Sequence, residues 1–269
     1  IKYVERTEET ALIRQAFTSR VTEAKPVILV AIEGLGGVGK SQIALDYFYQ
    51  AQDYTQAIWF SGKTPEILLQ QYQKFGFEQG FLERDAKADD IVVRVKQWLI
   101  NNPGWLIVVD GADNQKEISP MLPIQGGHLL ITSRHKNWPG TIIPIKILKP
   151  EKAVEMLNRL SGRADSEAAE LVKKLGFLPL AIAQVAAYIH NNKITTEEYL
   201  DLYEDVRNKL LNEILDEDAL GHESLLVTWN ISIAAIANEN KNSDNPHLAQ
   251  EILTVCSYLH SDYIPRSTL

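Results

Sequence analysis

The chain has 269 residues, of which 45% are hydrophobic, and its formal net charge is -8 at pH 7. This length and composition are typical of a globular protein with two or three domains. The acidic balance argues against broad nucleic-acid binding, because that function needs a positive surface field.

The first half of the chain alternates short aliphatic runs with helical patterns. We expect strands at residues 26–33, 57–62, 104–113, 127–134 and 141–145. We expect helices after Lys40 and at residues 64–77 and 89–100. Aliphatic runs of this kind are typical of strands that are buried on both faces of a parallel sheet. The alternation therefore predicts an α/β fold with a doubly wound parallel sheet over residues 1–148.

Two segments in this part of the chain predict where a helix begins and where a strand lies in the sheet. Thr64 is the expected N-cap of a helix that has Pro65 at its first position. Pro144 lies in the last expected strand, which therefore belongs at an edge of the sheet or at a bend.

The second half of the chain is helical in pattern. Residues 149–212 predict a small helical bundle domain, and residues 213–269 predict a charged linker followed by part of a third unit. The chain begins at Ile1 rather than at Met, so we expect it to be part of a longer protein.

A glycine-rich segment separates the first expected strand from the first expected helix after it. Residues 34–41 read GLGGVGKS and match the phosphate-loop pattern G-x-x-x-x-G-K-[ST]. In this context the backbone N–H groups and the helix N-terminus bind phosphates, Lys40 contacts the β- and γ-phosphates, and Ser41 binds Mg²⁺. The alternative is a glycine-rich turn that carries Lys and Ser by chance. The predicted nucleotide-binding residues of this segment are Gly34, Gly36, Gly37, Val38, Gly39, Lys40, Ser41 and Gln42.

Charged residues follow two other expected strands. Asp110 ends the run WLIVVD and is the predicted second Mg²⁺ ligand. Arg134 ends the run LLITSR and is the predicted sensor of the γ-phosphate. Asp113 is the candidate for orienting the attacking water, provided that the chain turns back after Gly111. The alternative role for Asp113 is to cap a helix that starts near Asn114.

A fourth motif, GFLPLA at residues 176–181, narrows the class of protein. Together with GLGGVGKS, WLIVVDGAD and LLITSR, it resembles the NB-ARC family of signal-transduction (STAND) P-loop ATPases, which includes plant resistance and apoptosome-type proteins. The resemblance covers about residues 1–265. It implies that residues 213–269 are a partial winged-helix-like domain. It also implies a resting state held by ADP, exchange for ATP, opening of the domains and self-association.

The resemblance adds three nucleotide-binding candidates. Pro179 of the GFLPLA motif would contact adenine, and the segment YVERTEE makes Val4 and Arg6 candidates for packing against the adenine edge. Two positions depart from the family pattern. Glu5 stands where glycine is common, and Gly111 stands where many relatives have a second acid after Asp110.

These observations predict an ATP- and ADP-binding switch with slow hydrolysis, whose sensor and effector domains lie outside this chain. Two alternatives stay open, a P-loop turnover enzyme such as a small-molecule kinase and a nucleotide-gated transcription regulator. With Cys256 as its one cysteine and no apolar run of about 18 residues, the chain is expected in the cytoplasm or a host cytosol. We expect neither a membrane partner nor direct nucleic-acid binding.

Overall fold

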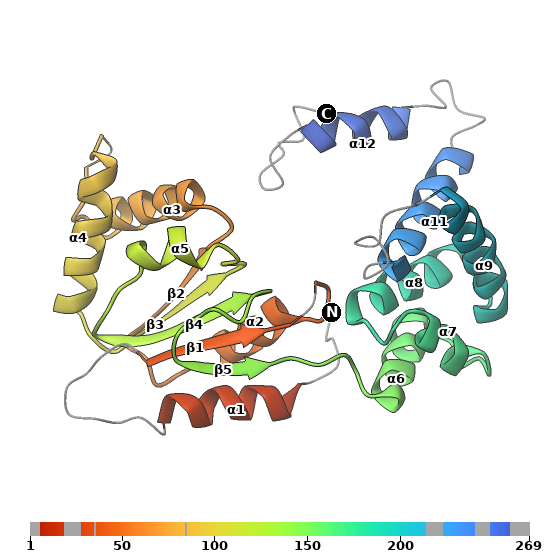
Figure 1. Cartoon of the computed structure of the whole chain (residues 1–269), viewed down its shortest axis with the longest axis horizontal. Coiled ribbons are helices and arrows are strands. Elements are labelled where there is room, and N and C mark those ends of the chain that lie inside the picture. The colour runs from red at the N-terminus through yellow and green to blue at the C-terminus, as the bar shows by residue number, and fades with distance from the viewer. Residues whose placement is uncertain are drawn as a thin grey trace. The chain divides into compact units, whose positions relative to one another are not determined.

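The computed structural model describes residues 6–18, 28–34, 36–83, 85–213, 223–239 and 248–258. Its contacts divide the chain into two compact units, Ile1–Ile147 and Leu148–Leu269 (Figure 1). The first contains the sheet, and the described part of the second is helical.

The first unit contains a five-stranded parallel sheet. Its strands are β1 (Ile28–Glu33), β2 (Gln56–Ser61), β3 (Trp105–Asp110), β4 (Gly127–Ser133) and β5 (Thr141–Pro144). They lie in the order β2-β3-β4-β1-β5, and every neighbouring pair is parallel. All carboxyl ends therefore reach the same edge of the sheet. Within this sheet β5 pairs with β1 alone, which confirms the edge position that Pro144 predicts.

Different helices cover the two faces of the sheet, because side chains alternate along each strand. Ile107 and Val109 pack on one face with α3 (Pro65–Glu78) and α4 (Ala88–Asn101). Leu106 and Val108 pack on the other face with α1 (Thr7–Thr18) and α2 (Lys40–Gln50). The sheet is thus doubly wound, as the alternation of strands and helices predicts.

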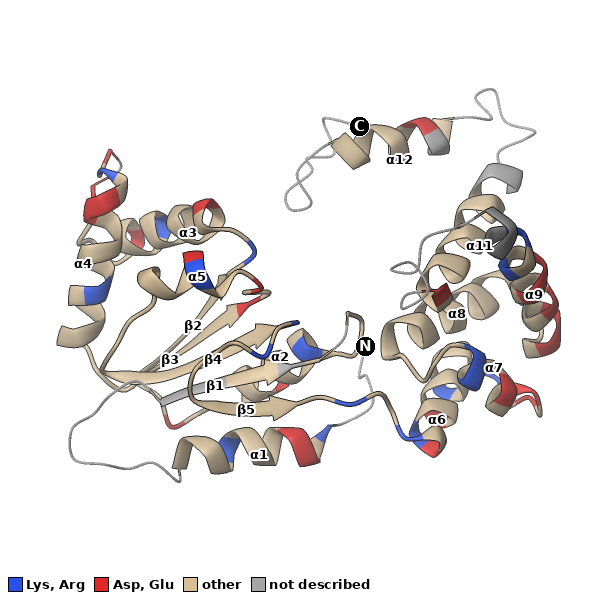
Figure 2. Ribbon diagram, viewed as in Figure 1, with Lys and Arg blue, Asp and Glu red and all other residues tan. Residues whose placement is uncertain are grey.

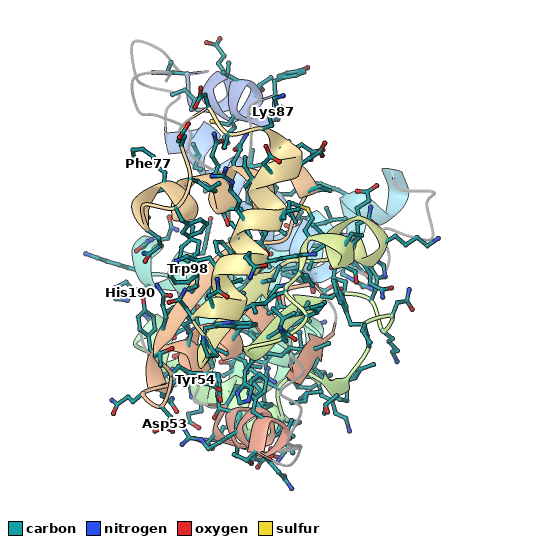
Figure 3. The ribbon with its side chains drawn as sticks, turned by 90° about the vertical axis from the view of Figure 1, so that its left-hand side faces the viewer. Asp53, Tyr54, Phe77, Lys87, Trp98 and His190 are labelled. Carbon is teal, nitrogen blue, oxygen red and sulfur yellow. The ribbon has the colours of Figure 1, made fainter. Side chains whose placement is uncertain are left out.

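The helices on the first face begin and pack as their residues predict. Thr64 caps α3, since its Oγ1 accepts a hydrogen bond of 3.3 Å from the backbone N of Ile67. Trp98 of α4 packs against Phe75 and Phe81, with ring centroids 5.2 and 5.4 Å away (Figure 3). This aromatic cluster ties α3 to α4. After β3 the chain continues through α5 (Gln115–Ile118) and the 3₁₀ helix η1 (Ser119–Met121).

In the second unit, the described residues form helices and their connections. The helices are α6 (Pro150–Ser161), α7 (Ala168–Lys174), α8 (Pro179–Asn192), α9 (Thr196–Glu213), α11 (Glu223–Glu239) and α12 (Leu248–Tyr258). α11 packs against α8 and α9 and buries Val227 and Ile231. Thr228 Oγ1 also donates to Gln184 Oε1 of α8 at 3.0 Å. These contacts join α11 to the bundle, and a separate winged-helix-like domain over residues 213–269 stays a prediction.

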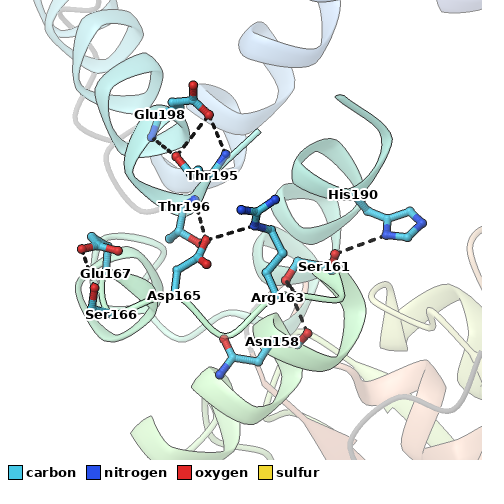
Figure 4. A network of polar contacts seen from close by, with 10 residues as sticks. All are labelled: Asn158, Ser161, Arg163, Asp165, Ser166, Glu167, His190, Thr195, Thr196 and Glu198. Atoms are coloured by element: carbon cyan, nitrogen blue, oxygen red, sulfur yellow. Dashed lines mark hydrogen bonds and ion pairs between the residues drawn. The ribbon is translucent and has the colours of Figure 1, made fainter. Parts of the chain in front are cut away.

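A polar network ties the connections of this bundle together (Figure 4). Asp165 Oδ2 accepts hydrogen bonds from Thr196 N and Oγ1, at 2.9 and 2.8 Å, and from Arg163 Nε at 3.3 Å. Asp165 thereby satisfies the first backbone N–H of α9. His190 of α8 lies with Nδ1 3.2 Å from the Ser161 carbonyl oxygen at the end of α6. Within the described ranges, we find no helix with the length and apolar character of a membrane span.

Candidate nucleotide-binding site

The glycine-rich segment connects β1 to α2 at the carboxyl edge of the sheet. Gly39 is the N-cap of α2 and has a φ of 100°, a left-handed value that residues with a side chain rarely adopt. Gly34 needs glycine for a different reason, because a Cβ there would come 2.8 Å from the carbonyl oxygen of Ile145. Backbone geometry therefore requires glycine at both ends of the loop, as a phosphate cradle does.

Lys40 is the first residue of α2 and lies against the loop that precedes it. Its Nζ donates a hydrogen bond of 2.7 Å to the carbonyl oxygen of Gly34. The ammonium therefore lies at the start of the loop, close to the N-terminus of α2. A cation and a helix N-terminus at the same place both favour a bound anion.

The Arg6 side chain forms a hydrogen bond with the backbone of the loop. Its guanidinium donates to the backbone oxygen of Val38 at 3.1 Å, to that of Lys146 at 2.9 Å and to Glu9 Oε1 at 3.0 Å. The Arg6 side chain is only 10% exposed. Sequence reasoning missed this positioning role because no local pattern brings residue 6 to residue 38. The adenine-packing role of Arg6 stays a prediction.

Asp110 ends β3 at the same edge, two strands away from β1, which corresponds to about 10 Å across the sheet. Its Oδ1 accepts a hydrogen bond of 2.5 Å from Thr132 Oγ1. The Thr132 oxygen in turn accepts a bond of 2.8 Å from the backbone N of Gly111. Since that N–H occupies an acceptor site of Thr132, the hydroxyl hydrogen is directed at Asp110. Thr132 is therefore a positioning residue that sequence reasoning missed.

Asp113 and Arg134, both predicted to act on the γ-phosphate side, form an ion pair. Asp113 Oδ2 lies 2.5 Å from Arg134 Nε, and Oδ1 accepts from Arg134 N at 2.7 Å. Ser133 Oγ also donates to Oδ1 at 3.3 Å. Gly111 has a φ of 74°, so the chain does turn back there as expected. Helix α5 has Asn114 as its N-cap, and the Asp113 carboxylate binds Arg134 instead of capping that helix.

Opposing effects act on the protonation of Asp113. Burial raises the pKa of its carboxyl group, but hydrogen bonds from the Arg134 backbone and side chain, together with the Arg134 charge, outweigh burial and lower the pKa overall. The Arg134 side chain is 61% exposed, so it can reach a ligand at this edge.

Two predicted adenine contacts lie outside this cluster. Val4 falls outside the described residues. Pro179 belongs to the second unit, where it is the first residue of α8, after Leu178 in an extended conformation. The structure thus brings the loop, Arg6, Asp110, Asp113 and Arg134 together in the first unit, while the part of Pro179 in a nucleotide site stays a prediction.

The residues present fit a magnesium–nucleotide complex. Mg²⁺ prefers oxygen ligands and is usually bound by one or two protein groups together with phosphates and waters. Ser41 supplies a hydroxyl in the first turn of α2, and Asp110 supplies a carboxylate whose Oδ1 is held by Thr132. The Oδ2 oxygen of Asp110 is then the one that a cation would take.

Comparison with known proteins tests the resemblance that the motifs indicate. No family model matches the chain. A nucleotide-binding leucine-rich repeat (NLR)-like protein of Hyaloscypha variabilis is 27% identical over 100% of this chain and 30% of its own length. The regulatory protein AfsR of Streptomyces griseus is 26% identical over 68% of this chain and 20% of its own length. The disease resistance RPP8-like protein 3 of Arabidopsis thaliana is 23% identical over 74% of this chain and 25% of its own length. These relatives confirm the resemblance to the NB-ARC family.

The NB-ARC-like chain spans 20% to 30% of the length of these curated relatives. Two solved structures are also similar to it. A STAND protein with a tetratricopeptide repeat sensor from Pyrococcus horikoshii has a TM-score of 0.46 and 21% identity, and covers 84% of this chain and 39% of its own. A RuvB mutant from Thermotoga maritima has a TM-score of 0.47 and 14% identity, and the match covers 76% of this chain and 71% of the RuvB chain.

Proposed function

We propose that this chain is the adenine-nucleotide-binding switch of a signalling protein. In this proposal, bound ADP holds a resting state, and exchange for ATP permits opening and self-association. The observation that carries the proposal is a phosphate loop between β1 and α2 with Asp110 and Arg134 at the same sheet edge. The similarity to an NLR-like protein and to a disease resistance-like protein supports the same class.

Each group at the edge has a task in this proposal. The loop N–H groups, the start of α2 and Lys40 bind the phosphates. Ser41 and Asp110 hold Mg²⁺, which when bound neutralises phosphate charge. Arg134 senses the γ-phosphate, and Pro179 and Val4 contact adenine.

Slow hydrolysis is part of the proposal. A general base works best when its pKa lies near the operating pH. The ion pair with Arg134 lowers the pKa of Asp113, so its carboxylate is a weak base. Contact of Arg134 with a γ-phosphate would weaken this ion pair and release the carboxylate toward water. The pairing therefore supports a low basal rate that changes with the bound nucleotide.

The nucleotide that accompanies the purified protein tests the proposal. We expect ion-pair chromatography of the denatured protein to show ADP, and calorimetry to show tighter binding of ADP than of ATP. A preference for guanine nucleotides, or no nucleotide binding at all, would overturn the proposal. Steady-state turnover in the range of about 1–100 per second, as in kinases, would favour the enzyme alternative.

Charge distribution bears on the transcription-regulator alternative. Figure 2 shows acidic residues along α9, whose sequence TEEYLDLYEDVRNKLLNE contains Glu197, Glu198, Asp201, Glu204 and Asp205. A surface of this sign repels a phosphate backbone, so this face of α9 is unsuited to hold DNA. Duplex DNA binding with a steep salt dependence would revive that alternative.

A further inference from the structure

The end of β2 carries a polar group that the site described above does not use. The hydroxyl oxygen of Ser61 is shut off from solvent and has no hydrogen-bond partner among the described residues. Buried polar groups without a partner are rare in native proteins, and each requires an explanation, such as a bound water or a functional role.

The alternation of side chains fixes the face on which Ser61 lies. Phe60 contacts Tyr72 of α3, with ring centroids 4.9 Å apart, so its side chain belongs to the α3 face. Trp59 contacts Phe48 of α2, at 5.7 Å, so its side chain belongs to the opposite face. Ser61 is two residues after Trp59 and therefore lies on the α2 face, which also carries the phosphate loop's helix.

Two other polar residues lie at or next to the ends of their strands on the same face. Ser61 is in register with Asp110 of the neighbouring strand β3. Asp110 follows Val108 by two residues, and Thr132 of β4 follows Leu130 by two, and both apolar residues pack with α2. A serine, an aspartate and a threonine thus lie in a row across β2, β3 and β4, with the carboxylate in the middle.

The hydroxyl groups of Thr132 and Ser61, on the two sides of Asp110, differ in their hydrogen bonding. Thr132 donates its hydroxyl hydrogen to Asp110 Oδ1. The backbone at Ser61 is fixed, because its N donates to Gln71 Oε1 at 2.7 Å and the next residue, Gly62, donates to the Asp110 carbonyl oxygen at 2.7 Å. The Ser61 side chain therefore starts from a fixed backbone position beside Asp110, and its hydroxyl has no hydrogen-bond partner among the described residues.

We propose that binding of Mg²⁺ and nucleotide uncovers the Ser61 hydroxyl, which then forms a hydrogen bond with a water of the magnesium–nucleotide complex beside Asp110. Mg²⁺ keeps several of its waters when proteins bind it, and these waters need hydrogen-bond partners in the site. Ser61 supplies one such partner on the β2 side of Asp110. This inference rests on the proposed function, since it requires that Mg²⁺ and nucleotide bind at this edge.

The test compares stability and binding in Ser61→Ala. Because the hydroxyl has no partner among the described residues, its removal is expected to leave the melting temperature of the nucleotide-free protein unchanged or raised. Calorimetry with ATP and Mg²⁺ is expected to show roughly threefold to tenfold weaker binding, as for the loss of one hydrogen bond. Binding of ATP in EDTA is expected to be unchanged.

Ser161→Ala is the matched control. Ser161 is also buried, at 4% exposure, but its Oγ donates to the Asn158 carbonyl oxygen in the second unit. This variant is expected to melt at a lower temperature and to bind Mg²⁺ and ATP as the wild type does. Ser61→Cys, which replaces the hydroxyl with a somewhat larger thiol that bonds water weakly, is expected to bind like Ser61→Ala.

The outcomes separate the two proposals. If wild-type protein binds no nucleotide, the proposed function is wrong and this inference falls with it. If the wild type binds ATP more tightly with Mg²⁺ and Ser61→Ala does so equally, only the inference about Ser61 is overturned. A marked drop in the melting temperature of nucleotide-free Ser61→Ala would also overturn it, because the hydroxyl would then have a structural partner.

Discussion

The Asp113 carboxylate binds the Arg134 guanidinium, with 2.5 Å between Oδ2 and Nε, across the ends of β3 and β4. Two residues predicted to act separately on the γ-phosphate side are thus a coupled pair. We expect Asp113→Ala and Arg134→Ala each to slow single-turnover ATP hydrolysis by roughly 10–10³-fold. Because each orients the other, the double variant should be little slower than the slower single one.

A single-turnover assay on the four proteins, each saturated with ATP and Mg²⁺, measures this coupling. Calorimetry should show that Asp113→Ala still binds ATP, which separates positioning from binding. If Asp113→Ala hydrolyses ATP at the wild-type rate, the pair is structural. Fully additive losses would show that the residues act independently.

Lys40 should determine nucleotide affinity. Replacing it with Ala removes the cation beside Gly34, and we expect a loss of about 2–4 kcal/mol in nucleotide binding. The rise in melting temperature on adding ADP should shrink accordingly, since stabilisation by a ligand follows its affinity. Lys152→Ala is the control, because Lys152 lies on α6 and pairs with Glu155 at 2.7 Å. An unchanged ADP shift in Lys40→Ala would rule out the phosphate cradle.

Arg6 should stabilise the loop even before nucleotide binds. Its removal leaves the backbone oxygens of Val38 and Lys146 without their donor, so we expect Arg6→Ala to lower the free energy of unfolding by about 1–3 kcal/mol. ADP affinity should fall as well. Arg6→Lys should rescue neither quantity fully, since one ammonium cannot reproduce the planar fork.

Chemical denaturation with and without ADP measures both effects of Arg6. Arg14→Ala, on the exposed side of α1, is the control and should behave like the wild type. If Arg6→Ala keeps full stability and loses only nucleotide affinity, the side chain acts on the nucleotide and not on the loop.

His128 should make the first unit sensitive to mild acid. Its ring stacks on Phe17 at 4.5 Å, and its Nδ1 lies 2.7 Å from the Tyr54 hydroxyl. Burial lowers the pKa of His128. The unfolded chain therefore takes up the proton first, at pH values below about 6.5. Stability is then fully present above that pH and decreases as the pH falls below it.

Urea unfolding followed by tryptophan fluorescence, at a series of pH values from about 8 to 5, measures the slope in that window. We expect His128→Gln to flatten it. Tyr54→Phe, which keeps the imidazole, should retain it. Equal slopes in His128→Gln and the wild type would assign the pH dependence to other groups.

Sequence reasoning recovered what local patterns encode. The acid at the end of β3, Asp110, and the start of α2 at Lys40 follow from an aliphatic run that meets an acid and from glycines that precede a helix, although the strand expected at 104–113 ends earlier, at Asp110. Neither depends on distant parts of the chain. The turn at Gly111 could also be predicted, because glycine is the residue that tolerates a φ of 74°.

The residues that were missed depend on the register of the sheet. Thr132 reaches Asp110 because β3 and β4 are neighbours with aligned ends, and no spacing along the chain encodes that alignment. The same holds for Ser61, whose significance comes from its register with Asp110. Arg6 contacts Val38 and Lys146, which lie 32 and 140 residues away along the chain, and no local pattern encodes these contacts.

The contacts of Arg6 have a mechanical consequence. The Arg6 guanidinium donates to the backbone oxygen of Val38 in the phosphate loop and to that of Lys146. Lys146 lies two residues before Leu148, where the second unit begins. Arg6 therefore connects the phosphate loop to the segment that leads into the second unit, and a shift of the backbone at Lys146 would act on Val38 through this side chain.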